Sequence, residues 1–120
     1  MDQFTEGYIT CAFWSSLDDD GTPLDELEND PAPETIAAME RDCAEFQTEH
    51  ADLLKLAYSH ETESYSRARA GHDFWLTRNG HGAGFWDRGL GDVGDKLTAA
   101  AHAAGSRDLY IGDDGLIYQA

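Results

Sequence analysis

The chain has 120 residues and carries 24 acidic side chains against 8 lysines and arginines, a formal net charge of −16. This length suits one domain, and a hydrophobic content of 41% is sufficient for a core, which argues against a disordered acidic tail. The sign of the charge argues against direct binding to nucleic acids or to an anionic membrane surface, because both attract lysine and arginine. A partner that is recognised through charge is therefore basic.

The cysteines and the start of the sequence indicate a cytoplasmic protein. The first residues have neither the basic nor the apolar region of a secretion signal, and no apolar run is long enough to span a bilayer. Cys11 and Cys43 lie in apolar surroundings, without a C-x-x-C pattern or a histidine at zinc-finger spacing. We expect two buried, reduced thiols and no metal or cofactor, with a disulfide as the alternative.

The negative charge is concentrated in the first half of the sequence. Residues 1–60 hold 15 acidic and 2 basic side chains, a net charge of −13, whereas residues 61–120 hold 9 acidic and 6 basic ones, a net charge of −3. An acidic half is thus followed by a nearly balanced aromatic half, and we expect both to form a single domain.

The clearest element of the acidic half is a long amphipathic helix. Residues 7–14 suit a helix or a strand, and their spacing favours a short helix. Residues 15–33 form a loop rich in turn formers. Pro33 suits a first helical position, and an apolar stripe with alternating spacings of three and four residues predicts a helix from about Pro33 to Tyr58. Residues 61–70 extend this helix or form a second one. The stripe consists of Ile36, Met39, Cys43, Phe46, His50, Leu53 and Ala57.

The second half is expected to contain two hairpins and one helix. Residues 72–78 and 84–88 are rich in aromatic residues and flank an Asn-Gly turn signal, which predicts the first hairpin. Residues 92–104 form an Ala-rich helix that ends at Gly105, and residues 108–111 and 116–119 form the second hairpin. Since the strands come in pairs and do not alternate singly with helices, the sequence predicts an α+β fold with a small antiparallel sheet.

A row of carboxylates follows another face of the long helix. Its members are spaced three or four residues apart, which brings neighbouring side chains to roughly 5–6 Å on a helix surface. Such a row repels itself, so it is either a solvated face or an array of anions held for a basic partner. The row consists of Asp42, Glu45, Glu49 and Asp52.

The loop segment Asp18-Asp19-Asp20-Gly21-Thr22 resembles the D-x-D-G-T motif of the haloacid dehalogenase-like phosphatases. The resemblance implies that Asp18 is a nucleophile and Asp20 a general acid, with Mg²⁺ held by a carboxylate and a backbone carbonyl. In that family the motif follows a buried parallel strand, and residues 12–17 are a poor strand. A calcium loop of the EF-hand type fails because Pro23 occupies the position of its glycine. The alternative is a polar turn.

Residues 71–89 combine two histidines with aromatic, acidic and basic side chains. His72 and His81, together with Asp73 or Asp87, are candidates for an acid–base pair or a metal site. No serine or cysteine nucleophile is placed beside them. The alternative, which we favour, is an aromatic hairpin core in which the polar side chains satisfy turns.

Two segments, GHDFWLTRNGHGAGFWDRGLG (residues 71–91) and LYIGDDGLIY (residues 109–118), resemble a family of small acidic proteins of bacteriophages and mobile elements. The resemblance implies expression inside an infected bacterium, where small acidic proteins bind host proteins. It supplies no catalytic residues.

The leading hypothesis is a non-enzymatic interaction protein that acts as a DNA mimic. Its carboxylates would stand in for phosphates in the basic groove of a host nucleic-acid-binding protein, such as a defence nuclease. The alternatives are a small metal-dependent hydrolase that uses His72 and His81 or Asp18 and Asp20, and a protein whose charge serves only solubility. The predicted partner-binding residues are Asp18, Asp19, Asp20, Asp42, Glu45, Glu49 and Asp52.

Overall fold

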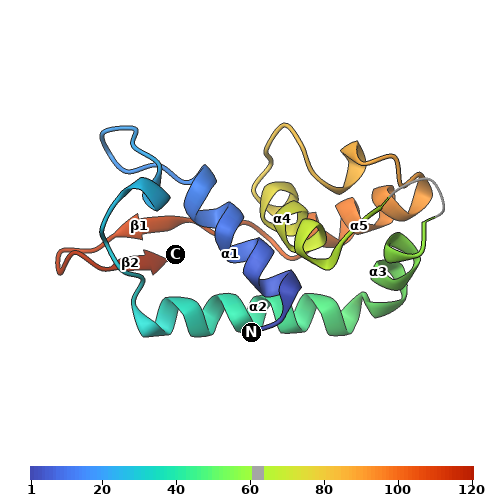
Figure 1. Cartoon of the computed structure of the whole chain (residues 1–120), viewed down its shortest axis with the longest axis horizontal. Coiled ribbons are helices and arrows are strands. Elements are labelled where there is room, and N and C mark those ends of the chain that lie inside the picture. Colours follow the sequence, from blue (N-terminus) through green and yellow to red (C-terminus); the bar gives the residue numbers. More distant parts are fainter. Residues whose placement is uncertain (61–63) are drawn as a thin grey trace.

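The chain folds around the crossing of two helices, α1 (Gln3–Ser15) and α4 (Arg67–Arg78). The computed structural model describes residues 1–60 and 64–120. Around this crossing lie α2 (Pro33–Glu49), α3 (Ala51–Tyr58), α5 (Asp92–Ala103), two 3₁₀ turns (Leu24–Glu26 and Phe85–Asp87) and a hairpin of β1 (Leu109–Ile111) and β2 (Ile117–Gln119) (Figure 1). The molecule is elongated, with extents of 46 × 25 × 23 Å.

Glycines allow the backbones of α1 and α4 to touch. A Cβ atom placed on Gly71 would lie 1.8 Å from the carbonyl oxygen of Phe4, and one on Gly7 would lie 2.0 Å from that of Ala68. No other residue type fits at these two positions. Each glycine lowers helix propensity by about 1 kcal/mol relative to alanine, and the close packing of the two helices offsets this cost.

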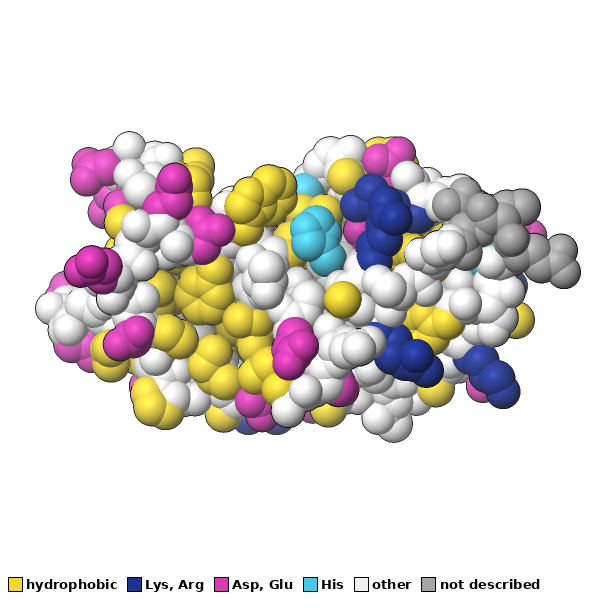
Figure 2. Space-filling model, in the orientation of Figure 1, with side chains coloured by type: hydrophobic (Ala, Val, Ile, Leu, Met, Phe, Trp, Pro, Cys, Tyr) yellow, Lys and Arg dark blue, Asp and Glu magenta, His cyan; other side chains and the backbone are white. Residues whose placement is uncertain are grey.

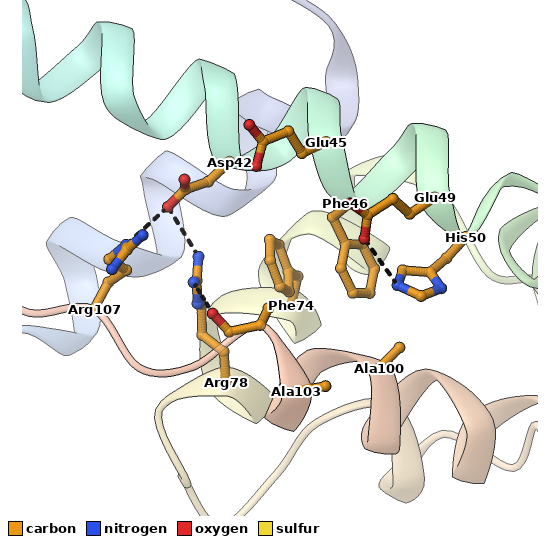
Figure 3. A pocket seen from close by; sticks show the side chains of 11 residues that line it. Asp42, Glu45, Phe46, Glu49, His50, Phe74, Arg78, Ala100, Ala103 and Arg107 are labelled. Carbon is orange, nitrogen blue, oxygen red and sulfur yellow. Dashed lines mark hydrogen bonds and ion pairs between the residues drawn. The ribbon is translucent and has the colours of Figure 1, made fainter.

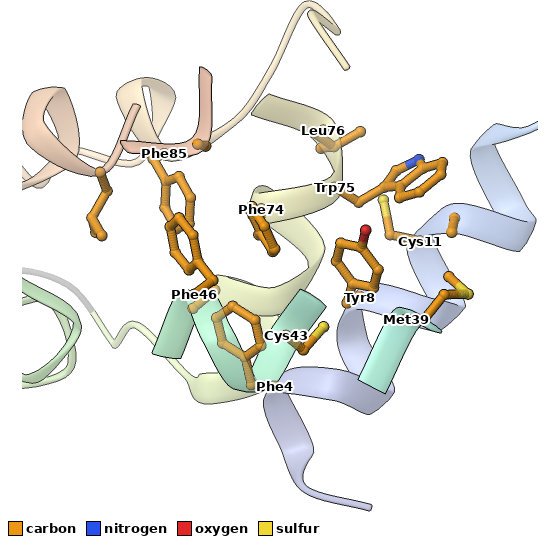
Figure 4. Packing of buried hydrophobic residues seen from close by; sticks show 14 of the residues in the cluster. Phe4, Tyr8, Cys11, Met39, Cys43, Phe46, Phe74, Trp75, Leu76 and Phe85 are labelled. Carbon is orange, nitrogen blue, oxygen red and sulfur yellow. The ribbon is translucent and has the colours of Figure 1, made fainter. Parts of the chain in front are cut away.

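Aromatic rings from four elements form the centre of the core. The ring of Phe46 on α2 stacks on Phe74 of α4 at 4.0 Å between centroids and lies 6.0 Å from Phe85. Tyr8 of α1 approaches Phe74 at 5.2 Å. Figure 4 shows how these rings meet between the helices, with the two cysteines and Met39 beside them. Burial of such rings removes large apolar areas from water, which is the main favourable term in folding.

The predicted helix from Pro33 to Tyr58 is interrupted at His50. Pro33 begins α2 as expected, but His50 has φ −120° and ψ 28° and separates α2 from α3. After the break, Leu54 is buried, whereas Leu53, a member of the predicted apolar stripe, is only partly buried. The apolar spacing continues across the break, so the spacing alone does not reveal it.

The first predicted hairpin is wrong, because residues 67–78 form helix α4 and residues 85–87 a 3₁₀ turn. Of the stretch 61–70, residues 61–63 lie outside the described residues. The Asn-Gly signal ends the helix: the N–H of Gly80 bonds to the carbonyl of Thr77, and that of His81 to the carbonyl of Leu76. Gly80 has φ +70°, so the property that suits a hairpin turn serves here as a helix cap.

The other elements of the second half are confirmed. Helix α5 begins at Asp92 and ends at Ala103, shortly before Gly105, whose φ is +81°. Strands β1 and β2 pair antiparallel, with Tyr110 opposite Tyr118. The α+β class is therefore confirmed, with one hairpin in place of two among the described residues.

The cysteines are buried and free, as the sequence predicts. Burial raises the pKa of Cys11 and of Cys43 to about 12, so that thiolate is scarce at neutral pH. Within residues 1–60 and 64–120, no helix combines the length and the apolar character that crossing a membrane requires.

We expect Gly71→Ala to lower the free energy of unfolding by about 2 kcal/mol net of the gain in helix propensity, because its methyl group forces α1 away from α4. Gly82→Ala is the matched control, since a Cβ atom there meets nothing within 4 Å and Gly82 does not have a positive φ. Thermal and urea unfolding of both variants measure the difference. Equal stabilities would contradict the close contact.

Candidate functional site

Three carboxylates of the row on α2 line one cavity, of about 300 Å³, between α2 and α5. The rings of Phe46 and Phe74 lie at its base, and the alanines of α5 face them (Figure 3). The fourth member, Asp52, is exposed on α3 and does not line the cavity. The carboxylates that line it are Asp42, Glu45 and Glu49.

Asp42 is already neutralised within the protein. Its carboxylate accepts from Nη1 of Arg78 and from Nε of Arg107, each at 3.1 Å. Its side chain is only 12% exposed. Asp42 therefore offers little charge to a partner.

Arg78 is the residue that sequence reasoning missed at this site. Its guanidinium also donates to the hydroxyl of Tyr8 at 3.0 Å and to the carbonyls of Ala104 and Gly105 at 3.1 and 2.7 Å. It thus joins α1, α2 and α4 to the end of α5. A lone arginine within the aromatic run F-W-L-T-R was the available signal, because an arginine among apolar residues needs partners.

The other two carboxylates that line this cavity, Glu45 and Glu49, form no ion pair with a lysine or arginine of the described residues. Glu45 and Glu49 are exposed, and Glu49 lies 3.8 Å from the imidazole of His50. That imidazole packs on the ring of Phe46, with 4.8 Å between centroids. Of the three carboxylates that line the cavity, Asp42 is therefore neutralised by arginines, and only Glu45 and Glu49 are open to a partner.

The structure brings together two acidic turns that are far apart in the sequence. Asn29 donates to the carbonyl of Gly115 at 2.7 Å, and main-chain bonds on both sides of Ile117 join β2 to the same loop. Residues 18–34 and 112–115 thus form one end of the molecule, here called the acidic end (Figures 1 and 2). It contains no lysine or arginine and ten carboxylates, those of Asp18, Asp19, Asp20, Asp25, Glu26, Glu28, Asp30, Glu34, Asp113 and Asp114.

The acidic end is ordered by its own side chains. Asp18 is half-buried, and its carboxylate accepts from the backbone N–H groups of Asp20 and Thr22 at 2.9 and 2.8 Å. Asp114 accepts from the hydroxyl of Tyr118 and from the N–H of Leu116, and these two hydrogen bonds lower the pKa of its carboxyl. Both carboxylates cap turns. Asp114 and the remaining eight carboxylates of the acidic end are exposed.

The surroundings of Asp18 differ from those of the phosphatase motif. The chain enters this loop from helix α1, whereas the family requires a strand at that point. Asp19 and Asp20 are exposed. Among the residues that the structure describes, no group of three or more His, Cys, Asp or Glu side chains is arranged to hold a metal ion.

The two histidines of residues 71–89 are not brought together. His72 lines a cavity between α1 and α4, whereas the exposed His81 lines another one beside Trp75. The pairing of His72 and His81 that a hairpin would allow is thus lost with the hairpin. Nδ1 of His72 instead lies 3.9 Å from the carboxylate of Asp73.

Asp73 is a fully buried carboxylate with its own arginine. It accepts from Nε and Nη2 of Arg88 at 2.9–3.1 Å and from the hydroxyl of Tyr65 at 2.5 Å. Burial alone would raise the pKa of Asp73, but His72, Arg88 and Tyr65 together hold it below its ordinary value. The same pairing raises the pKa of Arg88.

Comparisons with protein-family models, curated proteins and solved structures found no match to this chain. The sites are therefore interpreted from their own geometry, and the resemblance to the phage proteins remains a prediction.

We expect Asp73→Asn to destabilise the fold by about 3 kcal/mol at neutral pH, because Arg88 would be left without its counter-charge. The folded-state pKa of Asp73 lies below the unfolded one. Its contribution is therefore fully present above about pH 4 and is lost as the pH falls through the folded-state pKa. Urea unfolding across this range should show the curves of the wild type and the variant converging toward acid. The exposed Asp87→Asn is the control, and curves that stay parallel would contradict the assignment.

Proposed function

We propose that this chain is a non-enzymatic interaction protein whose acidic end binds a basic partner. The observation that supports the proposal is the concentration of ten carboxylates, without a lysine or arginine, in residues 18–34 and 112–115. Hydrogen bonds between the loop and β2 hold these two segments together. The charges thus sit on a fixed surface, so a partner meets them without the cost of ordering a flexible tail.

A basic groove that binds nucleic acid is the partner that suits this surface best. Such a groove attracts phosphates largely through charge, so an ordered array of carboxylates can occupy it in their place. In its sharpest form the proposal is that the protein is a DNA mimic. The resemblance of residues 71–91 and 109–118 to phage proteins supports a host protein as the partner, and a defence nuclease is one such protein.

The carboxylates of α2 are less suited to bind a partner than those of the acidic end. Asp42 is paired with Arg78 and Arg107. Within residues 1–60 and 64–120, no arginine pairs with a carboxylate of the acidic end, and nine of its ten carboxylates are exposed.

A metal-dependent hydrolase, the alternative function, has less support. His72 and His81 line different cavities, and the carboxylate of Asp18 is engaged in a turn. No observation on the described residues favours this reaction class over binding.

The proposal is tested by neutralising equal numbers of charges at two places. The partner is captured from a bacterial lysate at low salt, purified, and titrated with the wild type and two variants. The first variant changes four exposed carboxylates of the acidic end to amides, namely Asp19, Asp20, Glu28 and Asp113. The control variant does the same on α2 and α3, at Glu40, Glu45, Glu49 and Asp52.

We expect the acidic-end variant to bind about 30-fold more weakly, since four exposed ion pairs contribute about 0.5 kcal/mol each. The control variant should lose much less, duplex DNA should displace the wild-type protein, and affinity should fall steeply with salt. Equal losses in both variants would show that only total charge matters. Affinity that is insensitive to salt would overturn the proposal.

A further inference from the structure

A cavity of about 560 Å³ lies between α1 and α4. Glu6, Gly7 and Thr10 of α1 form one side, while Ala68, Arg69 and His72 of α4 and the following Arg88 form the other. Figure 2 shows basic and histidine side chains gathered on this face, in the half of the molecule away from the acidic end.

This cavity has a cationic lining in a strongly acidic protein. Arg69, Arg88 and His72 line it together with one carboxylate, that of Glu6. The buried Asp73 already balances the charge of Arg88, so Arg69 supplies the uncompensated positive charge and Arg88 supplies fixed N–H donors. Within the part of the chain that the structure describes, no acidic side chain forms an ion pair with Arg69. Arg88 uses Nε and Nη2 to hold Asp73, so its Nη1 is left for another acceptor.

The carboxylate of Asp73 holds the guanidinium of Arg88 in place. Asp73 is fully buried and contacts it at 2.9–3.1 Å, while the hydroxyl of Tyr65 holds the other side of the carboxylate. Burying such a pair costs desolvation energy, and apolar residues often serve stability equally well. The advantage of a buried carboxylate at this place is therefore orientation: it fixes the donor groups of the arginine before a ligand binds. Asp73 is thus a positioning residue for Arg88.

The cavity also has an apolar part. Gly7 and Ala68 lie where the backbones of α1 and α4 touch, and they contribute no charge to the lining. Trp14, one turn beyond Thr10, is 57% exposed, and its ring lies 6.1 Å from that of His72. An exposed tryptophan beside a cationic cavity suits a ligand with a planar ring.

We propose that this cavity binds a phosphate monoester that carries an aromatic base. Arg69, Arg88 and the hydroxyl of Thr10 take the phosphoryl group, and the ring lies against Trp14 and His72. Donors from three side chains suit the three terminal oxygens of a phosphoryl group better than the two of a carboxylate. This inference is independent of the proposed function, because it uses neither the acidic end nor a protein partner.

The test is an NMR titration of the ¹⁵N-labelled full chain with adenosine monophosphate, with adenosine and inorganic phosphate as comparison probes. Saturable shifts are expected at the amides of Gly7, Thr10 and residues 68–72. Adenosine should bind at least about tenfold more weakly, which corresponds to about 1.4 kcal/mol. Inorganic phosphate should compete with the nucleotide.

Arg69→Gln should weaken nucleotide binding at least about tenfold, and Arg69→Lys should keep part of the affinity, because lysine retains the charge but not the planar fork. Arg69 is exposed and its side chain makes no hydrogen bond to the described residues, so both variants should fold, as circular dichroism can verify. The exposed Arg41→Gln, on α2, is the matched control. The absence of saturable shifts at millimolar nucleotide, equal binding of adenosine, or equal losses in Arg41→Gln and Arg69→Gln would each overturn the proposal.

Discussion

Helices α1 and α4 touch backbone to backbone at Gly7 and Gly71, and the positions of the other elements follow from this contact. It sets Tyr8 against Phe74, which carries the aromatic stack into α2. It also lets Arg78, at the end of α4, reach the hydroxyl of Tyr8 and the last carbonyls beyond α5. The same contact forms the floor of the cationic cavity, so one packing constraint shapes both the core and a candidate binding site.

The arginines decide how the charge is distributed in space. Arg78, Arg88 and Arg107 come from the nearly balanced half of the sequence, and they neutralise carboxylates in the middle of the molecule. Among the residues that the structure describes, no lysine or arginine forms an ion pair with a carboxylate of the acidic end. The uneven charge of the two sequence halves therefore becomes, in the folded protein, a contrast between an acidic end and a body of mixed charge. Basic and histidine side chains are visible on one face of that body (Figure 2).

The elements predicted correctly are those bounded by residues with a clear local signal, such as a proline at a helix start or a glycine after a helix end. The start of α2 at Pro33, the end of α5 before Gly105 and the last hairpin were all predicted correctly. Residues 72–78 of α4 were predicted as a strand because a short buried aromatic run such as Phe74-Trp75-Leu76 suits either element, and the glycine of the helix cap also suits a hairpin turn. The pairing of Asp42 could not be predicted, since Arg78 and Arg107 lie 36 and 65 residues away along the chain.

The contact between β2 and the acidic loop has a consequence for the order of events during synthesis. The loop leaves the ribosome early, whereas Ile117 and the carbonyl of Gly115 that hold it emerge some 86 residues later than Asn29. Domains generally fold as units as they are made. Ile117 also belongs to the hydrophobic core, so a nascent chain has neither a complete core nor a fixed array of negative charge until the hairpin has been synthesised.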